Sequence, residues 1–133
     1  MGWSMPRSDL RSRTKAFALA IIRLVDELPR NRYGDVIGRQ LLRAATSVAA
    51  NYRSACRARS RKDFIAKMGI VEEEADESQF WLEVVADCAL IDSSRVSPLG
   101  KEAGELVAIT VSSIRTARRA PHSTPHSAVR IPH

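Results

Sequence analysis

The stretch from Gln40 to Trp81 narrows the possible folds more than any other part of this sequence. It contains no proline and one glycine, and its apolar residues recur at helical spacing. Near its middle, the segment ARSRKDF interrupts the pattern, and Ser60 lies three residues before Asp63, as in a helix-capping box. We therefore predict two long helices joined at a tight corner, with the other segments packed around them.

The helix before this corner carries two opposite faces. At about 100° per residue, the apolar line collects Ile37, Leu41, Ala44, Val48, Tyr52 and Ala55. The opposite line collects Arg39, Arg43, Thr46, Ala50, Arg53 and Arg57. The first face is expected to join a core, and the second spreads its arginines over about 27 Å. These arginines could be solvated, or they could bind phosphates or an acidic protein surface.

Periodicity and helix start and stop signals divide the whole chain. We predict helices over about 9–28, 35–59, 61–91 and 98–119, a flexible lead-in over 1–8 and a disordered tail over 120–133. Pro29 ends the first helix, and Ser97 with Pro98 starts the fourth. Few β-branched or aromatic runs alternate with period two, so the expected fold class is all-α.

Two of the predicted helices show seams for packing. The first seam is Leu10, Thr14, Phe17, Ile21, Leu24 and Leu28, at alternating spacings of four and three. The seam of the third helix is Phe64, Met68, Val71, Ala75, Ser78, Leu82, Val85 and Ala89. Ile65, Ile70, Trp81 and Val84 lie off that seam. This extra apolar stripe indicates a second buried contact, inside the bundle or between subunits.

The net charge of +6 is unevenly distributed, with +10 in residues 1–67 and −4 in residues 68–133. Such polarity can pair helices within the fold or match the faces of two subunits, whereas a purely nucleic-acid-binding domain is more often basic throughout. No apolar run approaches the ~20 residues of a membrane span, and the segment MGWSMPRSDL has no apolar signal region. We expect a cytoplasmic protein with no membrane contact. Cys56 and Cys88 are interpreted as small buried thiols, with a disulfide left open.

The sequence lacks the common catalytic patterns. It has no Gly-rich phosphate loop, GxSxG, HExxH or paired CxxC. His122, His126 and His133 all lie in the predicted tail, so a Ser or Cys nucleophile has no histidine base. Prolines on both sides of His122 and His126 prevent a helical metal spacing. We therefore expect no enzymatic activity, no cofactor and no metal.

An acidic run occupies the third predicted helix: Glu72, Glu73, Glu74, Asp76, Glu77 and Glu83. Bundles that hold two metals with carboxylates also use Glu-x-x-His elements, which this sequence lacks. Like charges four residues apart repel, as at Glu73 and Glu77, so pairing with arginines of another helix or subunit is the simplest relief. We expect Glu73, Asp76, Glu77 and Trp81 to make contacts between subunits.

The sequence resembles the ribosomal-RNA intervening-sequence proteins over about residues 9–115. The matching segments are Gln40-Leu41-Leu42-Arg43, Ala45-Thr46-Ser47, Ala50-Asn51-Tyr52, Ser60-Arg61-Lys62-Asp63-Phe64, Lys67-Met68, Glu74-Ala75 and Trp81-Leu82. The resemblance implies an antiparallel up-down four-helix bundle that assembles into a homopentameric ring. A relative of this family, the accessory protein of diversity-generating retroelements, binds nucleic acid through a basic surface and partners a reverse transcriptase.

The chain departs from its relatives where they carry a glutamate soon after the Asn-Tyr pair, a position that is Ser54 here. Its third helix is also more acidic, with Glu73, Asp76 and Gln79 where relatives mix in lysine and arginine. We therefore place nucleic-acid binding on the basic side of the corner, at Arg39, Arg43, Arg53, Arg57, Arg59, Arg61 and Lys62.

The leading hypothesis is a non-enzymatic, self-associating bundle whose basic face contacts RNA or DNA largely independently of sequence. The guanidinium fork suits phosphate oxygens, and no aromatic residue interleaves the arginines to stack on bases. The alternative is a protein-interaction scaffold, in which the basic face pairs with the acidic helix of a neighbouring subunit.

Overall fold

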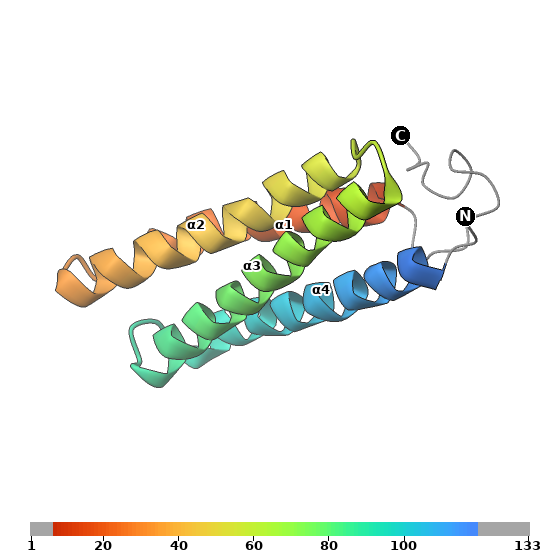
Figure 1. The fold of residues 1–133 in the computed structure, drawn as a ribbon. Helices are drawn as coiled ribbons and strands as arrows, with labels where there is room; N and C mark the ends of the chain where they lie inside the picture. Colours follow the sequence, from red (N-terminus) through yellow and green to blue (C-terminus); the bar gives the residue numbers. More distant parts are fainter. Residues whose placement is uncertain (1–6, 120–133) are drawn as a thin grey trace.

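The computed structural model describes residues 7–119, which form four α-helices and no strand. The helices are α1 (Arg7–Val25), α2 (Arg32–Ala55), α3 (Arg61–Asp87) and α4 (Ser93–Arg119). Consecutive helices run in opposite directions and are joined by short turns (Figure 1). The all-α class and the helical bundle are thus confirmed. The rest of the predicted lead-in, 1–6, and the predicted tail, 120–133, lie outside the described residues.

The predicted seams form the core. In α1 the side chains of Leu10, Thr14, Phe17, Ile21, Leu24 and Leu28 are all buried, the last of them just past the end of the helix. In α3 the seam is buried from Phe64 to Val85. Off that seam, Ile65 and Trp81 pack partly against the core, whereas Ile70 stays 41% exposed. The periodicity of the apolar residues therefore locates the buried faces correctly.

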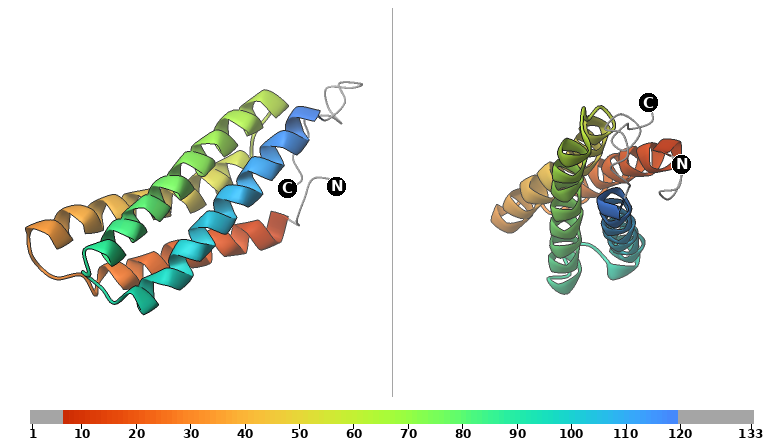
Figure 2. Two further views of the ribbon diagram at one scale, coloured as in Figure 1. Left: turned by 90° about the horizontal axis from the view of Figure 1, so that it is seen from below. Right: turned by 45° about the vertical axis from the view of Figure 1, so that its right-hand side comes forward.

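The contact between α1 and α4 is the weakest of the neighbouring helix contacts, and charged side chains bridge it. The left view of Figure 2 shows the two helices separating toward the end of the molecule where α1 begins. Arg13 of α1 spans this separation with ion pairs to Glu102 at 2.6 Å and Glu105 at 2.9 Å. Arg95 of α4 pairs with Glu27, just past the end of α1. These partly exposed pairs bridge the two helices where the bundle has its weakest contact.

Side-chain caps set the starts of α2 and α3. The Ser60 hydroxyl accepts a hydrogen bond from the Asp63 amide at 3.0 Å, so the predicted cap at the corner is confirmed. Asn31 caps α2 by accepting from the Gly34 amide at 2.9 Å, so this helix begins three residues earlier than predicted. Gly34 is required at the turn, because an added Cβ would lie 1.9 Å from the Pro29 carbonyl oxygen.

The predicted ends of the first two helices are too late, and α1 also begins earlier than predicted, at Arg7. After Val25 the chain tightens, and the Leu28 amide bonds to the Val25 carbonyl three residues back at 3.1 Å. The same happens after Ala55, where the Ala58 amide bonds to the Ala55 carbonyl at 3.0 Å. Because such turns keep the following residue on the buried side, the apolar pattern continues beyond the helix itself.

The turn between α3 and α4 corrects three predictions. Helix α3 ends at Asp87 because Ala89 adopts a left-handed backbone with φ 54°, and the Leu90 amide bonds to the Val85 carbonyl at 3.0 Å. Ala89 is therefore exposed rather than part of the seam. Helix α4 begins at Ser93, not at Pro98, because the Asp92 carboxylate accepts from the Ser94 amide at 3.1 Å.

The burial of the two cysteines also differs from the prediction in part. Both are free; Cys56 is buried, as expected, but Cys88 is exposed. Cys88 is the cap residue at the end of α3, where the chain leaves the core. The buried-thiol interpretation is therefore wrong for Cys88.

The left-handed residue at the end of α3 gives a stability prediction. Replacing Ala89 with glycine removes the contact between Cβ and the backbone, so Ala89→Gly should raise the free energy of unfolding by about 1 kcal/mol. The matched control is Ala66→Gly, on the exposed face inside α3, which should lower it by about 0.5–1 kcal/mol. Urea denaturation followed by circular dichroism measures both. Equal destabilisation by the two glycines would contradict the assigned turn.

Candidate nucleic-acid interface

The predicted arginine row is exposed along α2. Arg39, Arg43, Arg53 and Arg57 all point out of the core, and so do Arg59 and Lys62 at the corner between α2 and α3. These residues nevertheless lie in different surroundings. Arg43 is bound to α3, Arg39 lies at the far end of α2, and the other four exposed residues cluster at the corner. The seventh predicted residue, Arg61, is buried.

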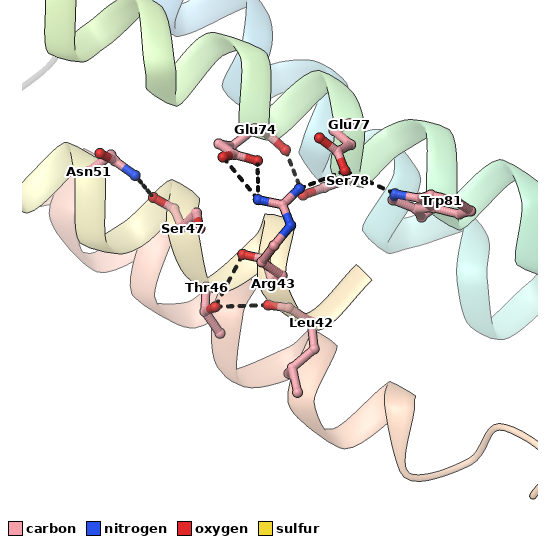
Figure 3. Close-up of polar contacts among 9 residues, drawn as sticks. All are labelled: Leu42, Arg43, Thr46, Ser47, Asn51, Glu74, Glu77, Ser78 and Trp81. Carbon is pink, nitrogen blue, oxygen red and sulfur yellow. Dashed lines mark hydrogen bonds and ion pairs between the residues drawn. The ribbon is translucent and has the colours of Figure 1, made fainter. Parts of the chain in front are cut away.

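Arg43 is the central residue, and its guanidinium is occupied by two carboxylates of α3 in the same chain (Figure 3). One nitrogen lies 3.1 Å from Glu74 and the other 2.6 Å from Glu77. Glu77 also accepts a hydrogen bond from the Trp81 indole at 3.2 Å. The hydrogen bond from Arg43, and to a smaller extent that from Trp81, lowers the pKa of Glu77. Glu77 and Glu74 in turn raise the pKa of Arg43. The repulsion among the carboxylates of α3 is thus offset at Glu74 and Glu77 by an arginine of the same chain, on the neighbouring helix α2.

Arg61 is the buried residue. It is 7% exposed, and its guanidinium donates to the Ala117 carbonyl in the last turn of α4 at 3.3 Å. Its position at the first turn of α3 brings the positive charge to the carbonyl end of a helix, where cations are favourable. Arg61 therefore ties the start of α3 to the end of α4.

Arg39 lies near the turn between α1 and α2, away from the other predicted binding residues. It lines a pocket of about 260 Å³ together with Arg30, Asp26 and Asp35. The nearby carboxylates offset the positive charge at this end. The structure therefore does not bring Arg39 together with Arg53 and Arg57.

A basic cluster forms at the opposite end of the bundle. Figure 1 shows that the start of α1, the corner between α2 and α3 and the end of α4 lie at the same end of the molecule. The exposed cations there are Arg11, Lys15, Arg53, Arg57, Arg59, Lys62, Arg115, Arg118 and Arg119, which we call the basic end. Within residues 10–119, none of these side chains makes an ion pair, and the nearby Asp63 pairs with Lys67 at 3.2 Å.

The residues of α1 and α4 in this cluster were missed by the sequence analysis. In the first helix only the apolar seam was interpreted, so the exposed cations Arg11 and Lys15 were not considered. Arg115, Arg118 and Arg119 lie about sixty residues beyond the arginine row. A possible signal was the basic last turn of α4, which an antiparallel order brings to the same end as the corner. Proximity of this kind comes from topology rather than from spacing.

A groove between α1 and α2 opens within the basic end. It has a volume of about 630 Å³. Its lining residues are Arg11, Ser12, Thr14 and Lys15 of α1 and Thr46, Ala49, Ala50 and Arg53 of α2. None of them is acidic or aromatic. The Thr14 hydroxyl donates to the Arg11 carbonyl and the Thr46 hydroxyl to the Leu42 carbonyl, so both donors are used inside their helices.

Three further carboxylates of α3 form an acidic surface. Glu73, Asp76 and Glu83 are exposed and make no ion pair with a described residue.

In the part of the chain that the structure describes, no group of three His, Cys, Asp or Glu residues could hold a metal ion. No helix there is both long and apolar enough to cross a membrane.

Comparison with known proteins places the chain in a family. A sequence model described as 23S rRNA-intervening sequence protein matches residues 8–112. The chain belongs to this family. A solved structure of a family relative supports the same fold: a protein of unknown function from the S23 ribosomal protein family of Bacteroides thetaiotaomicron is 31% identical and has a TM-score of 0.77. The match covers 84% of this chain and 99% of that one. A search of curated proteins found no match.

The pairing of Glu77 with Arg43 predicts how stability changes with pH. Because the folded-state pKa of Glu77 is lowered, its stabilising contribution is present above the unfolded-state pKa and is lost as the pH falls through the folded-state value. Glu77→Gln should therefore lower the free energy of unfolding by about 0.2–1 kcal/mol near pH 7. The difference from the unsubstituted chain should shrink toward about pH 3, well below the ordinary glutamate pKa.

Urea denaturation at the two pH values measures this difference. Exposed Glu83, which makes no ion pair with a described residue, provides the control Glu83→Gln. A penalty for Glu77→Gln that stays the same at both pH values would show that the carboxylate charge is not what stabilises the contact.

Proposed function

We propose that this chain is a non-enzymatic, self-associating bundle that binds RNA or DNA through phosphate contacts at its basic end. The observation that carries the proposal is the convergence of exposed cations that have no carboxylate partner within residues 10–119. Arginine and lysine in this state are available to release counterions from a polyanion, which makes binding salt-dependent and largely independent of sequence. The resemblance adds the expectation that the self-associated form is a ring of five.

The placement of the acidic residues supports this proposal. Arg43 and Arg61 are bound by other residues of the same chain, and Glu74 and Glu77 are held against α2. The exposed carboxylates Glu73, Asp76 and Glu83 lie along α3 beyond its first turns, whereas the basic end includes only the start of that helix. Charge separation of this kind steers a polyanion toward one end of the molecule.

A second candidate function is a scaffold in which the basic end of one subunit binds the acidic surface of another. The exposed carboxylates of α3 without an ion-pair partner favour it, together with the partly exposed apolar side chains of Ile70 and Phe80 on the same helix. This arrangement would consume the cations in protein contacts and leave few for nucleic acid.

Charge reversal at the corner tests the leading function. Arg57→Glu with Arg59→Glu removes two exposed cations from the basic end, and Arg23→Glu with Lys101→Glu makes the same net change away from it. In fluorescence anisotropy with a labelled single-stranded RNA or DNA, the corner variant should bind at least about tenfold more weakly at low salt. Its slope of log K against log salt concentration, which is negative, should become less steep by about 1.4, while the control keeps its slope.

Light scattering across a salt series on the same variants separates the two functions. Binding that is weakened only by the corner variant, with an unchanged particle mass, supports nucleic-acid binding. An assembly that dissociates at high salt and in the corner variant, without measurable RNA or DNA binding by the unsubstituted chain, would establish the scaffold instead.

A further inference from the structure

We infer that the groove between α1 and α2 holds the sugar-phosphate backbone of one single-stranded polynucleotide, with the bases turned outward. This inference rests on the proposed function and makes it more specific. The proposed function requires cations somewhere at the basic end, whereas the inference assigns a particular concave site and one class of ligand.

The charges of the groove fit a single anionic strand. Arg11 and Lys15 lie on the α1 side, and Arg53 lies on the α2 side. All three are exposed and make no ion pair within residues 10–119. Because no carboxylate lines the groove, the cations act on the concave space from both sides, which concentrates the positive potential there.

The dimensions of the groove favour a strand over a duplex. The groove is a furrow on the surface where two packed helices meet, and their axes lie about 8–10 Å apart. A single backbone can follow so narrow a furrow, whereas a double helix is wider and can only lie across it. Arg11 and Lys15 are one helical turn apart, about 6 Å along the axis. Successive side chains on the α1 wall can therefore reach successive phosphates of the same strand.

The small residues of α2 make this approach possible. Ala49 and Ala50 line the groove where longer side chains would fill it. Their methyl groups offer an apolar surface to the sugar rings. The Ser12 hydroxyl is exposed and lies at the same site, where it can donate to a phosphate oxygen.

The absence of aromatic side chains from the lining sets the specificity. Proteins that bind single strands through their bases stack them on aromatic rings, and no aromatic residue lines this groove. Recognition through the backbone alone predicts similar affinities for oligo(U) and oligo(A), and for RNA and DNA of equal length.

Filling the groove without changing its charge tests the inference. Ala50→Phe places a ring in the groove, and Ala108→Phe places the same ring on the exposed face of α4. The probes are labelled twelve-nucleotide oligo(U) and oligo(dT), and a duplex of twelve base pairs. Ala50→Phe should weaken single-strand binding about tenfold or more, while Ala108→Phe binds as the unsubstituted chain does. Duplex binding should be weaker throughout and should change little in Ala50→Phe.

A second pair of variants keeps the test decisive if Ala50→Phe disturbs folding. Lys15→Gln removes a groove cation, and Arg23→Gln removes an exposed cation farther along the same helix. Only Lys15→Gln should weaken single-strand binding. Unchanged single-strand binding in Ala50→Phe and Lys15→Gln, with weaker binding in the corner variant, would overturn the groove while leaving the proposed function intact. Preferential binding of the duplex would also overturn the groove, and no binding of any probe would overturn both proposals.

Discussion

The burial of one apolar seam on each helix is the constraint on which the rest of this structure depends. Each seam is satisfied only by neighbouring helices, and short turns between them impose antiparallel order. That order brings the start of α1, the corner between α2 and α3 and the end of α4 to the same end of the molecule. The basic end is therefore a consequence of the packing, because cations that lie far apart in the sequence are carried there by helices that must pack side by side.

Electrostatics then acts differently in the middle of the bundle and at this end. Beside α3, Arg43 meets Glu74 and Glu77, and the charges neutralise each other where two helices pack. Between α1 and α4, Arg13 meets Glu102 and Glu105 and bridges the weakest of the contacts between neighbouring helices. At the basic end, Asp63 pairs with Lys67, and within residues 10–119 no carboxylate pairs with the exposed cations, which face solvent. Arginine thus joins helices in one place and lies exposed without such a partner in another.

The sequence predicted what depends on local periodicity and failed where three-dimensional placement decides. Buried Leu41 and exposed Arg53 follow from the 3.6-residue repeat, and the Ser60 cap follows from its spacing to Asp63. The pairing of Arg43 with α3 could not be predicted from the sequence, because no sequence pattern specifies which turn of α3 lies opposite Arg43. Ala89 was placed in a seam because alanine does not signal a left-handed residue in the way that glycine does. The groove was missed because its two walls come from α1 and α2, and periodicity treats each helix separately.

The most direct test of this account is to map where a polynucleotide touches the chain. Nuclear magnetic resonance spectra of the ¹⁵N-labelled protein, titrated with a short single-stranded oligonucleotide, report the affected backbone amides individually. The account predicts that the changes concentrate at Ser12, Lys15, Ala50 and Arg57, at the end of the bundle where cations converge, and that Glu73 and Asp76 on α3 are unaffected. Changes confined to the acidic surface of α3, or spectra that do not respond at any oligonucleotide concentration, would contradict it.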